Sequence, residues 1–160
     1  MTPSTFSPYW IAIADLNGDG FPDAVVSGSL LHGVAVLLNT GDGSFVVHQV
    51  LSIGNTPSGL AVADFDGDGI NDLAIAISST DKVAVLLGNG DGSFQPPRDF
   101  FGVGQVHGMV AVADLNGDGR PDMAVVTAQA SDGVSLLIDN TAQKSAPSCL
   151  GPRSPRADSK

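Results

Sequence analysis

Three copies of one acidic, glycine-rich stretch carry the strongest chemical signal in the chain. They run from Asp15 to Asp23, from Asp64 to Asp72 and from Asp114 to Asp122. Each copy places an oxygen-bearing side chain at positions 1, 3, 5 and 9, and glycine at positions 4 and 6. Carboxylate and amide oxygens gathered in this way suit a hard divalent cation, and Ca²⁺ is the ion that best tolerates an irregular cage of oxygens.

The predicted ligands follow from the curl of each loop. Glycine at positions 4 and 6 permits the curl, because glycine adopts positive φ without a steric cost. The side chains at positions 1, 3, 5 and 9 can then point inward, and the backbone carbonyl of position 7 can complete the ring. For up to three Ca²⁺ ions, one per repeat, the predicted metal-binding residues are Asp15, Asn17, Asp19, Phe21, Asp23, Asp64, Asp66, Asp68, Ile70, Asp72, Asp114, Asn116, Asp118, Arg120 and Asp122.

The loops have two other interpretations. An EF-hand needs a bidentate Glu at position 12 and flanking helices, whereas position 12 here is Val26, Ile75 or Val125 within an apolar stretch. Asx-rich turns without a metal are the second alternative. Crowded carboxylates repel one another unless they are neutralised, and three loops at matching positions of a repeat favour metal binding.

The composition argues against several classes of function and structure. The 160 residues include 17 acidic and 7 basic side chains, for a net charge of −10, and every acidic residue is Asp. This charge disfavours nucleic acid as a partner, because phosphate binding requires Lys and Arg. No apolar run approaches the roughly 18 residues of a membrane-spanning helix, so no membrane insertion is expected. Cys149 is the only cysteine, which excludes an intrachain disulfide.

The elements that position the loops recur with them, at spacings of 49 and 50 residues. A short apolar strand precedes each loop, a second follows it, and a third comes after a polar turn. Their β-branched, nearly continuous apolar character predicts burial on both faces. The predicted strands are 11–14, 24–27 and 33–38 in the first repeat, 60–63, 73–77 and 82–87 in the second, and 110–113, 123–127 and 133–138 in the third.

A second glycine-rich motif follows the third strand at Asn39–Phe45 and Gly88–Phe94. A tight hairpin is favoured over another metal loop, because each copy has a single carboxylate and Asp-Gly suits such turns. A fourth strand should then run from each Phe to about Ser52 and Phe101. The third repeat departs from the motif at 139–144, so no fourth strand is expected there. We interpret 141–160 as a disordered tail, with a role in interaction as the alternative.

One repeat therefore consists of four short antiparallel strands in about 50 residues, a unit that must stack on its neighbours to bury both faces. This predicts an all-β fold of β-propeller blades, incomplete at about three blades. The predicted divisions are blade 1 with its Ca²⁺ loop at 1–57, blade 2 with its loop at 58–107, a truncated blade 3 with its loop at 108–140, and the tail at 141–160.

The repeat resembles the FG-GAP/VCBS family, the blade type of integrin α-subunit heads and of many secreted bacterial proteins. Residues 61–74 and 83–94 carry the resemblance, which covers about 8–140. It implies a propeller of typically seven blades, with Ca²⁺ in the hairpin between a blade's first two strands and ligands bound at other loops. Because this chain has fewer blades, we expect either further blades of a longer chain or self-association, two chains giving six blades being the simplest assembly.

The function expected is a calcium-binding propeller module for extracellular protein or ligand binding, or for adhesion, in which calcium is structural. The alternatives are a carbohydrate-binding propeller and the non-catalytic propeller portion of a secreted hydrolase or lyase. An enzyme is not expected, because His32, His48 and His107 occupy different phases of the repeat. Tyr9 and Trp10 are a single aromatic pair, so no repeated sugar-stacking platform is seen. We expect an extracellular or cell-surface location, although no signal peptide is visible, and a protein or glycan partner.

Overall fold

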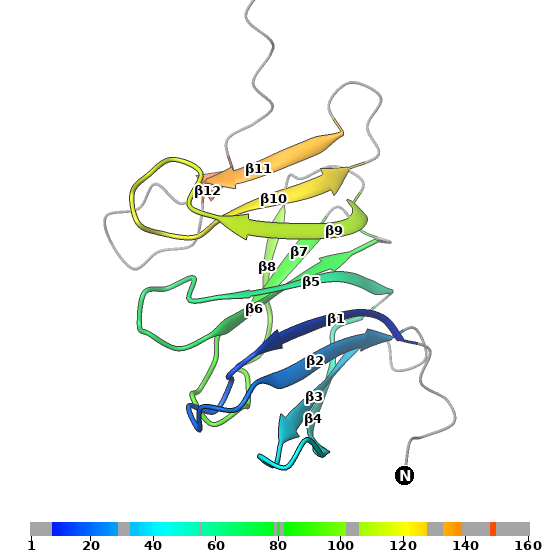
Figure 1. Cartoon of the computed structure of the whole chain (residues 1–160). Coiled ribbons are helices and arrows are strands. Elements are labelled where there is room, and N and C mark those ends of the chain that lie inside the picture. Colours follow the sequence, from blue (N-terminus) through cyan, green and yellow to red (C-terminus); the bar gives the residue numbers. More distant parts are fainter. Residues whose placement is uncertain are drawn as a thin grey trace, which may run out of the picture.

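Antiparallel β-strands form the regular structure in the part of the chain that the structure describes (Figure 1). The computed structural model describes residues 8–28, 33–54, 56–78, 80, 82–101, 106–127, 133–138 and 148–149. Within these ranges there is no helix, and so none that is long and apolar enough to cross a membrane. The predicted all-β fold is confirmed.

Three separate sheets each contain four strands in sequential order. We call them blades 1, 2 and 3. Blade 1 contains β1 (Pro8–Ala14), β2 (Asp23–Gly28), β3 (Gly33–Asn39) and β4 (Phe45–Ser52). Blade 2 contains β5 (Pro57–Ala63), β6 (Asp72–Ile77), β7 (Lys82–Leu86) and β8 (Arg98–Phe101). Blade 3 contains β9 (Val106–Ala113), β10 (Asp122–Thr127), β11 (Val134–Ile138) and β12 (Ser148–Cys149).

The fourth strand follows the prediction closely in blade 1 and less closely in blade 2. β4 begins at Phe45 and ends at Ser52, as expected. In blade 2, Phe94 forms only an isolated bridge with Gly88, and β8 does not begin until Arg98. Pro96 and Pro97 lie between them, and proline has no N–H to donate to a β-ladder. The two prolines therefore account for the shortened strand.

The prediction that blade 3 has no fourth strand was wrong. β12 pairs antiparallel with β11, Cys149 opposite Leu137 and Ser148 opposite Ile138. A Gly-Asp-Gly hairpin motif precedes β4 in the sequence, but no such motif precedes β12. The sequence pattern therefore did not predict this strand. The rest of the predicted tail, residues 141–147 and 150–160, lies outside the described residues, as does His32.

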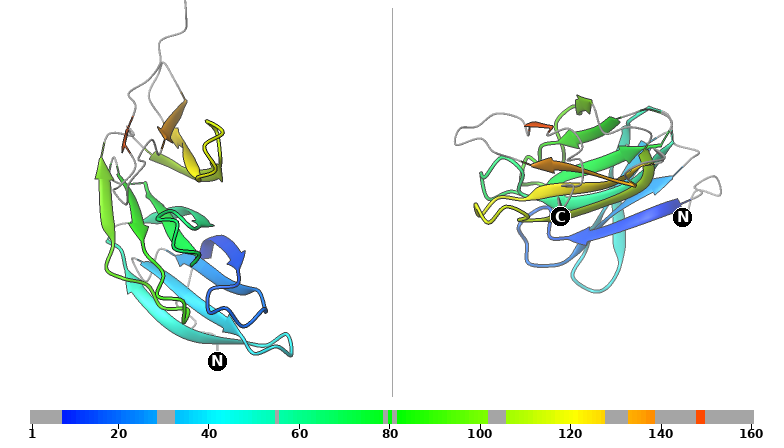
Figure 2. Two further views of the ribbon diagram at one scale, coloured as in Figure 1. Left: turned by 90° about the vertical axis from the view of Figure 1, so that its left-hand side faces the viewer. Right: turned by 90° about the horizontal axis from the view of Figure 1, so that it is seen from above.

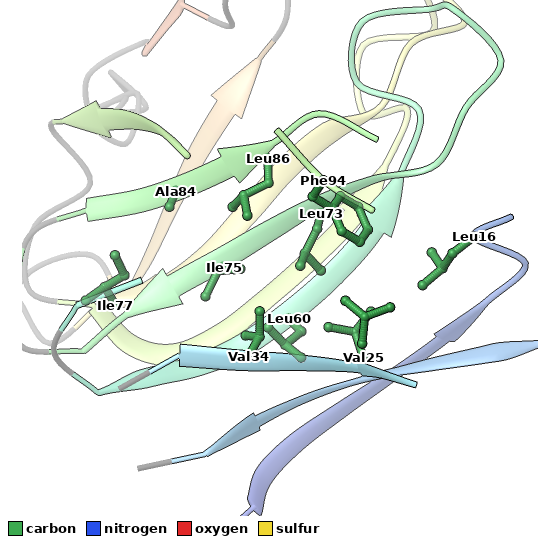
Figure 3. Packing of buried hydrophobic residues seen from close by; sticks show 11 residues of the cluster. Leu16, Val25, Val34, Leu60, Leu73, Ile75, Ile77, Ala84, Leu86 and Phe94 are labelled. Atoms are coloured by element: carbon green, nitrogen blue, oxygen red, sulfur yellow. The ribbon is translucent and has the colours of Figure 1, made fainter. Parts of the chain in front are cut away.

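The blades stack face to face in chain order, with blade 2 in the middle (Figures 1 and 2). The first strands β1, β5 and β9 are neighbours across the stack. Between blades 1 and 2 lies the first core, shown in Figure 3, whose members are Leu16, Val25, Val34, Val36, Leu60, Leu73, Ile75, Ile77, Ala84, Leu86 and Phe94. Between blades 2 and 3 lies the second core, made of Ala74, Ala76, Val83, Val85, Val110, Met123, Val125 and Leu137.

Burial on both faces is confirmed for blade 2. All six residues of β6 are buried, and they alternate: Leu73 belongs to the first core and Ala74 to the second. Burying a side chain such as Leu73 contributes about 1.5–3 kcal/mol to folding. Within the described residues, blades 1 and 3 each pack one face only, and Ile11 on β1 and Val134 on β11 are exposed.

Candidate metal centre

Each acidic loop joins the first two strands of its blade, and strand pairing closes it at the base. Ala14 pairs with Asp23, Ala63 with Asp72 and Ala113 with Asp122. The aspartate at position 9 is therefore the first residue of the second strand in every blade. The three loops occupy equivalent places on consecutive blades, as the sequence repeat predicts.

The aspartate at position 1 organises the curl of each loop. Asp15 accepts hydrogen bonds from the backbone N–H groups of Gly18 at 2.8 Å and Gly20 at 2.9 Å. Asp64 and Asp114 accept the equivalent pairs at 2.7–2.9 Å. The glycines at positions 4 and 6 all have φ between 74° and 86°, the left-handed region that glycine occupies without strain. The predicted reason for these glycines is confirmed.

The same backbone donors stabilise the ionised form of this aspartate. The hydrogen bond from Gly20 is the largest cause that holds the pKa of Asp15 below 3.8, and the hydrogen bond from Gly119 does the same for the pKa of Asp114. Hydrogen bonds to a carboxylate favour its charged state. Both side chains are therefore kept as anions, the state in which a carboxylate binds a metal ion.

The aspartate at position 9 is buried and has a second role that the sequence did not reveal. Asp72 accepts hydrogen bonds from the backbone N–H groups of Phe65 and Gly88, each at 2.8 Å. Asp23 does the same with Leu16 at 2.9 Å and Asn39 at 2.8 Å. This carboxylate thus fastens the start of its own loop to the end of the third strand. Asp122 repeats the first of these bonds, with Leu115 at 2.9 Å.

Position 3 distinguishes the loop of blade 2 from the other two. In blade 1 the side-chain amide of Asn17 donates to Asp19 at 2.8 Å, and in blade 3 Asn116 donates to Asp118 at 3.0 Å. Blade 2 has Asp66 at this position, which supplies another carboxylate in place of an amide donor. The loop of blade 2 is therefore the most negatively charged of the three.

A group of three carboxylates forms in this loop. Asp64, Asp66 and Asp72 each offer an oxygen, and these oxygens lie within 4.8 Å of one another. Burial is the largest cause that raises the pKa of Asp72, and the charges of Asp66 and Asp68 add to it, against the hydrogen bonds from Gly88 and Phe65. A cation placed among these oxygens would offset that repulsion. This group can hold a metal ion.

The other predicted ligands do not belong to the three-carboxylate group. Asp68 belongs to the same loop but not to the three-carboxylate group, and it accepts a hydrogen bond from the N–H of Ile70 at 2.8 Å. Across the described part of the chain, which includes all three loops, no second group of this kind is found. The carbonyls of Phe21, Ile70 and Arg120 and the side chains of the loops in blades 1 and 3 stay predictions. Those side chains are Asp15, Asn17, Asp19, Asp23, Asp114, Asn116, Asp118 and Asp122.

The second glycine-rich motif forms a hairpin, as predicted. Asn39 pairs with Phe45 across it, and the N–H of Thr40 donates to the carbonyl of Ser44 at 3.0 Å. Asp42 accepts hydrogen bonds from the Thr40 hydroxyl at 2.6 Å and from the Ser44 N–H at 2.9 Å. These local bonds satisfy the single carboxylate without a metal. The equivalent Asp91 accepts hydrogen bonds from the N–H and hydroxyl of Ser93.

Contacts between blades hold the loop of blade 1 against blade 2. The side-chain amide of Asn71 donates to the carbonyl of Asp15 at 2.8 Å, and the N–H of Gly92 donates to the carbonyl of Leu16 at 3.0 Å. Asn71 occupies position 8, where the other two loops have Pro22 and Pro121. In the sequence, the presence of asparagine instead of proline at position 8 is the one feature that indicates this contact.

Stacked four-stranded sheets, each with an acidic loop between its first two strands, define a class of β-repeat proteins built from propeller-type blades. A family model described as "FG-GAP-like repeat" matches residues 15–75 and again residues 64–125. The chain belongs to this family, and the resemblance noted from the sequence is confirmed. A comparison with curated proteins found no significant match.

Proposed function

We propose that the chain is a calcium-binding propeller module that binds an extracellular protein or other ligand, with calcium in a structural role. The observation that supports this most directly is the group formed by Asp64, Asp66 and Asp72, whose oxygens lie within 4.8 Å of one another. The group lies in a loop of an FG-GAP-like repeat, between two strands that form part of both cores.

The donor set favours calcium over other ions. All donors are oxygens, which excludes ions that prefer nitrogen or sulfur ligands. Ca²⁺ accepts six to eight oxygens in flexible geometry, whereas Mg²⁺ requires a near-ideal octahedron and gives up its waters reluctantly. All three carboxylates of the group already accept backbone hydrogen bonds, so their positions are fixed before an ion arrives. We propose that the Ca²⁺ ion binds these carboxylates and, in addition, the backbone carbonyl of Ile70.

A structural role follows from the position of Asp72. Its carboxylate joins the loop to the end of β7 through Gly88, so an ion that binds Asp72 also braces the second and third strands of the blade. Ion binding and folding stability should then be coupled. We propose weak affinity, roughly 10⁻⁴–10⁻³ M, as is usual for extracellular calcium modules. Such affinity suits a protein outside the cell.

Thermal unfolding in a chelator and in millimolar Ca²⁺ tests this proposal. The melting temperature of the wild-type chain should rise with Ca²⁺, and Asp66→Asn should reduce the rise. Asp42→Asn is the matched control, because it removes one carboxylate from the hairpin of blade 1 and should leave the rise unchanged. Identical melting curves of the wild-type chain in the two buffers would refute a structural calcium ion.

A binding module rather than an enzyme is the function that we propose for this fold. Most of the carboxylates in the described loops accept hydrogen bonds from their own backbone. His48 is an exposed residue of β4, and its ring lies 3.5 Å from where a Cβ at Gly92 of blade 2 would stand. A surface side chain beside the neighbouring blade supports the surface or packing role that we propose for it.

A further inference from the structure

The two outer blades each leave one apolar face uncovered by the described residues. We call the face toward the preceding blade the leading face and the face toward the following blade the trailing face. Inside the chain, the trailing face of blade 1 packs on the leading face of blade 2 to form the first core. The trailing face of blade 2 packs on the leading face of blade 3 to form the second core. The leading face of blade 1 and the trailing face of blade 3 lie at the two ends of the stack (Figure 2).

The leading face of blade 1 contains large aliphatic side chains. Ile11 and Ile13 on β1 are 57% and 56% exposed, whereas Ala12 and Ala14 between and after them pack on the first core. Leu60 stands in blade 2 where Ile11 stands in blade 1, and it is only 3% exposed because blade 1 covers it. A blade that packed on β1 would cover Ile11 in the same way.

The trailing face of blade 3 also exposes apolar residues whose equivalents in the other blades are buried. Leu16 and Leu115 occupy position 2 of their loops, yet Leu16 is 4% exposed against blade 2 and Leu115 is 49% exposed. On the third strand, Val134 and Leu136 of blade 3 are exposed. Their equivalents in blade 2, Val83 and Val85, are buried in the second core.

The sizes of the side chains follow one rule at both internal interfaces. The trailing face has alanine on its first strand, as at Ala12 or Ala61, and the leading face opposite it has a larger residue, as at Leu60 or Val110. The free faces keep this rule: Ala111 stands on the first strand of the free trailing face. Ile11 and Ile13 stand on the first strand of the free leading face. Each free face is therefore shaped for the other and not for itself.

We propose that a second copy of this chain covers these faces head to tail. The trailing face of blade 3 in one copy packs on the leading face of blade 1 in the other, and the reciprocal contact closes a ring of six blades. The face residues named above carry no charge, so the acidic loops do not oppose the contact. Contacts between unlike faces generate closed rings when the rotation closes. This inference is independent of calcium, because no residue of the three-carboxylate group lies on either free face.

Sedimentation velocity of the purified chain, in Ca²⁺ and in a chelator, tests the assembly. The wild-type chain should sediment as a dimer. Ile13→Asp on the leading face and Leu136→Asp on the trailing face should each weaken the dimer at least tenfold. Gln95→Asp adds the same charge at an exposed position of blade 2 and should leave the dimer intact. Circular dichroism melting curves verify that each variant is folded.

Mixing the two face variants distinguishes head-to-tail packing from other arrangements. An equimolar mixture of Ile13→Asp and Leu136→Asp should regain a 1:1 dimer, because one pair of unlike faces stays intact. A monomeric wild-type chain in both buffers would overturn the proposal, and so would a Leu136→Asp dimer as tight as wild type, which would mean that like faces pair. The calcium response of Asp66→Asn tests the metal site alone. Its result does not bear on whether the chain dimerises.

Discussion

The side-chain amide of Asn71 donates a hydrogen bond of 2.8 Å to the backbone carbonyl of Asp15, and so joins the acidic loops of two consecutive blades. The bond spans 56 residues of sequence. It exists because blade 2 has asparagine at position 8, where blades 1 and 3 have proline, a residue without any donor. The loop that contains the three-carboxylate group is therefore also the loop that holds its neighbour in place.

Replacing Asn71 with alanine should lower the free energy of unfolding by about 0.5–1.5 kcal/mol, the usual net contribution of one hydrogen bond. Urea denaturation in a chelator measures this change without a contribution from metal. Gln95→Ala removes an amide from an exposed position of the same blade and serves as the control. Equal losses in the two variants would show that the contact to Asp15 contributes no stability.

Asp72→Asn separates the structural role of position 9 from its role toward a metal ion. The Asp72 carboxylate accepts two backbone hydrogen bonds while buried, and an amide can accept only through its single oxygen. We expect a loss of about 1.5–3 kcal/mol in the free energy of unfolding, the range for a hydrogen bond to a charged group. Urea denaturation in a chelator is again the measurement.

The matched control for Asp72 is Asp68→Asn in the same loop. Asp68 is exposed and accepts one hydrogen bond, from Ile70, through an oxygen that asparagine retains. Its replacement should change the free energy of unfolding by less than about 0.5 kcal/mol. A loss at Asp72 no greater than that at Asp68 would contradict the role of position 9 as a fastening point.

Acid should weaken the hairpin of blade 1 through Asp42. The Thr40 hydroxyl is the largest cause that holds the pKa of Asp42 below 3.8, the value of the free side chain, and the bond from Ser44 adds to it. Because the folded pKa is the lower one, the stability from Asp42 is fully present above pH 3.8 and is lost as the pH falls through the folded pKa. Thr40→Val should raise the pKa of Asp42, as measured by carbon-13 NMR titration.

Thr40→Ser is the control for this pH effect, because it keeps the hydroxyl and removes only the methyl group. The pKa of Asp42 should stay low in Thr40→Ser and rise in Thr40→Val. Equal pKa values in the two variants would assign the shift to the backbone N–H of Ser44 instead.

Local patterns in the sequence were enough to predict most of the strands and the loops. The strand that precedes each loop ends next to position 1, and the glycines at positions 4 and 6 have the positive φ that the curl requires. Hydrophobic character predicted burial on both faces of blade 2, where every residue of β6 is buried. These features depend on neighbours close in sequence or on the repeat itself, which the sequence displays directly.

Features that depend on packing between distant segments, or on the exact geometry of side chains, could not be predicted. The β12 strand pairs with β11 although no hairpin motif announces it. The two bonds to Asp72 come from Phe65 and Gly88, and the second partner is 16 residues away. The hydrogen bond from Asn17 to Asp19 distinguishes the loop of blade 1 from that of blade 2, and it could be recognised only from the positions of the side chains. A pattern of oxygen-bearing residues treats Asn and Asp as equivalent ligands, but their hydrogen bonding differs.

That difference at position 3 yields the last prediction. Asn17→Asp should give the loop of blade 1 the character of the loop in blade 2, because it replaces the 2.8 Å donation to Asp19 with two facing carboxylates. Repulsion should lower the melting temperature in a chelator, and the added charge should enlarge the increase that Ca²⁺ produces. Calcium titration followed by thermal unfolding measures both effects in one sample.

The variant Asn17→Ser distinguishes charge from the mere loss of an amide. Serine replaces the amide that donates to Asp19 with a shorter hydroxyl and adds no carboxylate, so it should lower the melting temperature in a chelator but leave the response to Ca²⁺ no larger than that of wild type. If Asn17→Asp and Asn17→Ser respond alike to Ca²⁺, the charge at position 3 does not govern ion binding. The exceptional acidity of the loop in blade 2 would then have to be explained by something other than affinity for a cation.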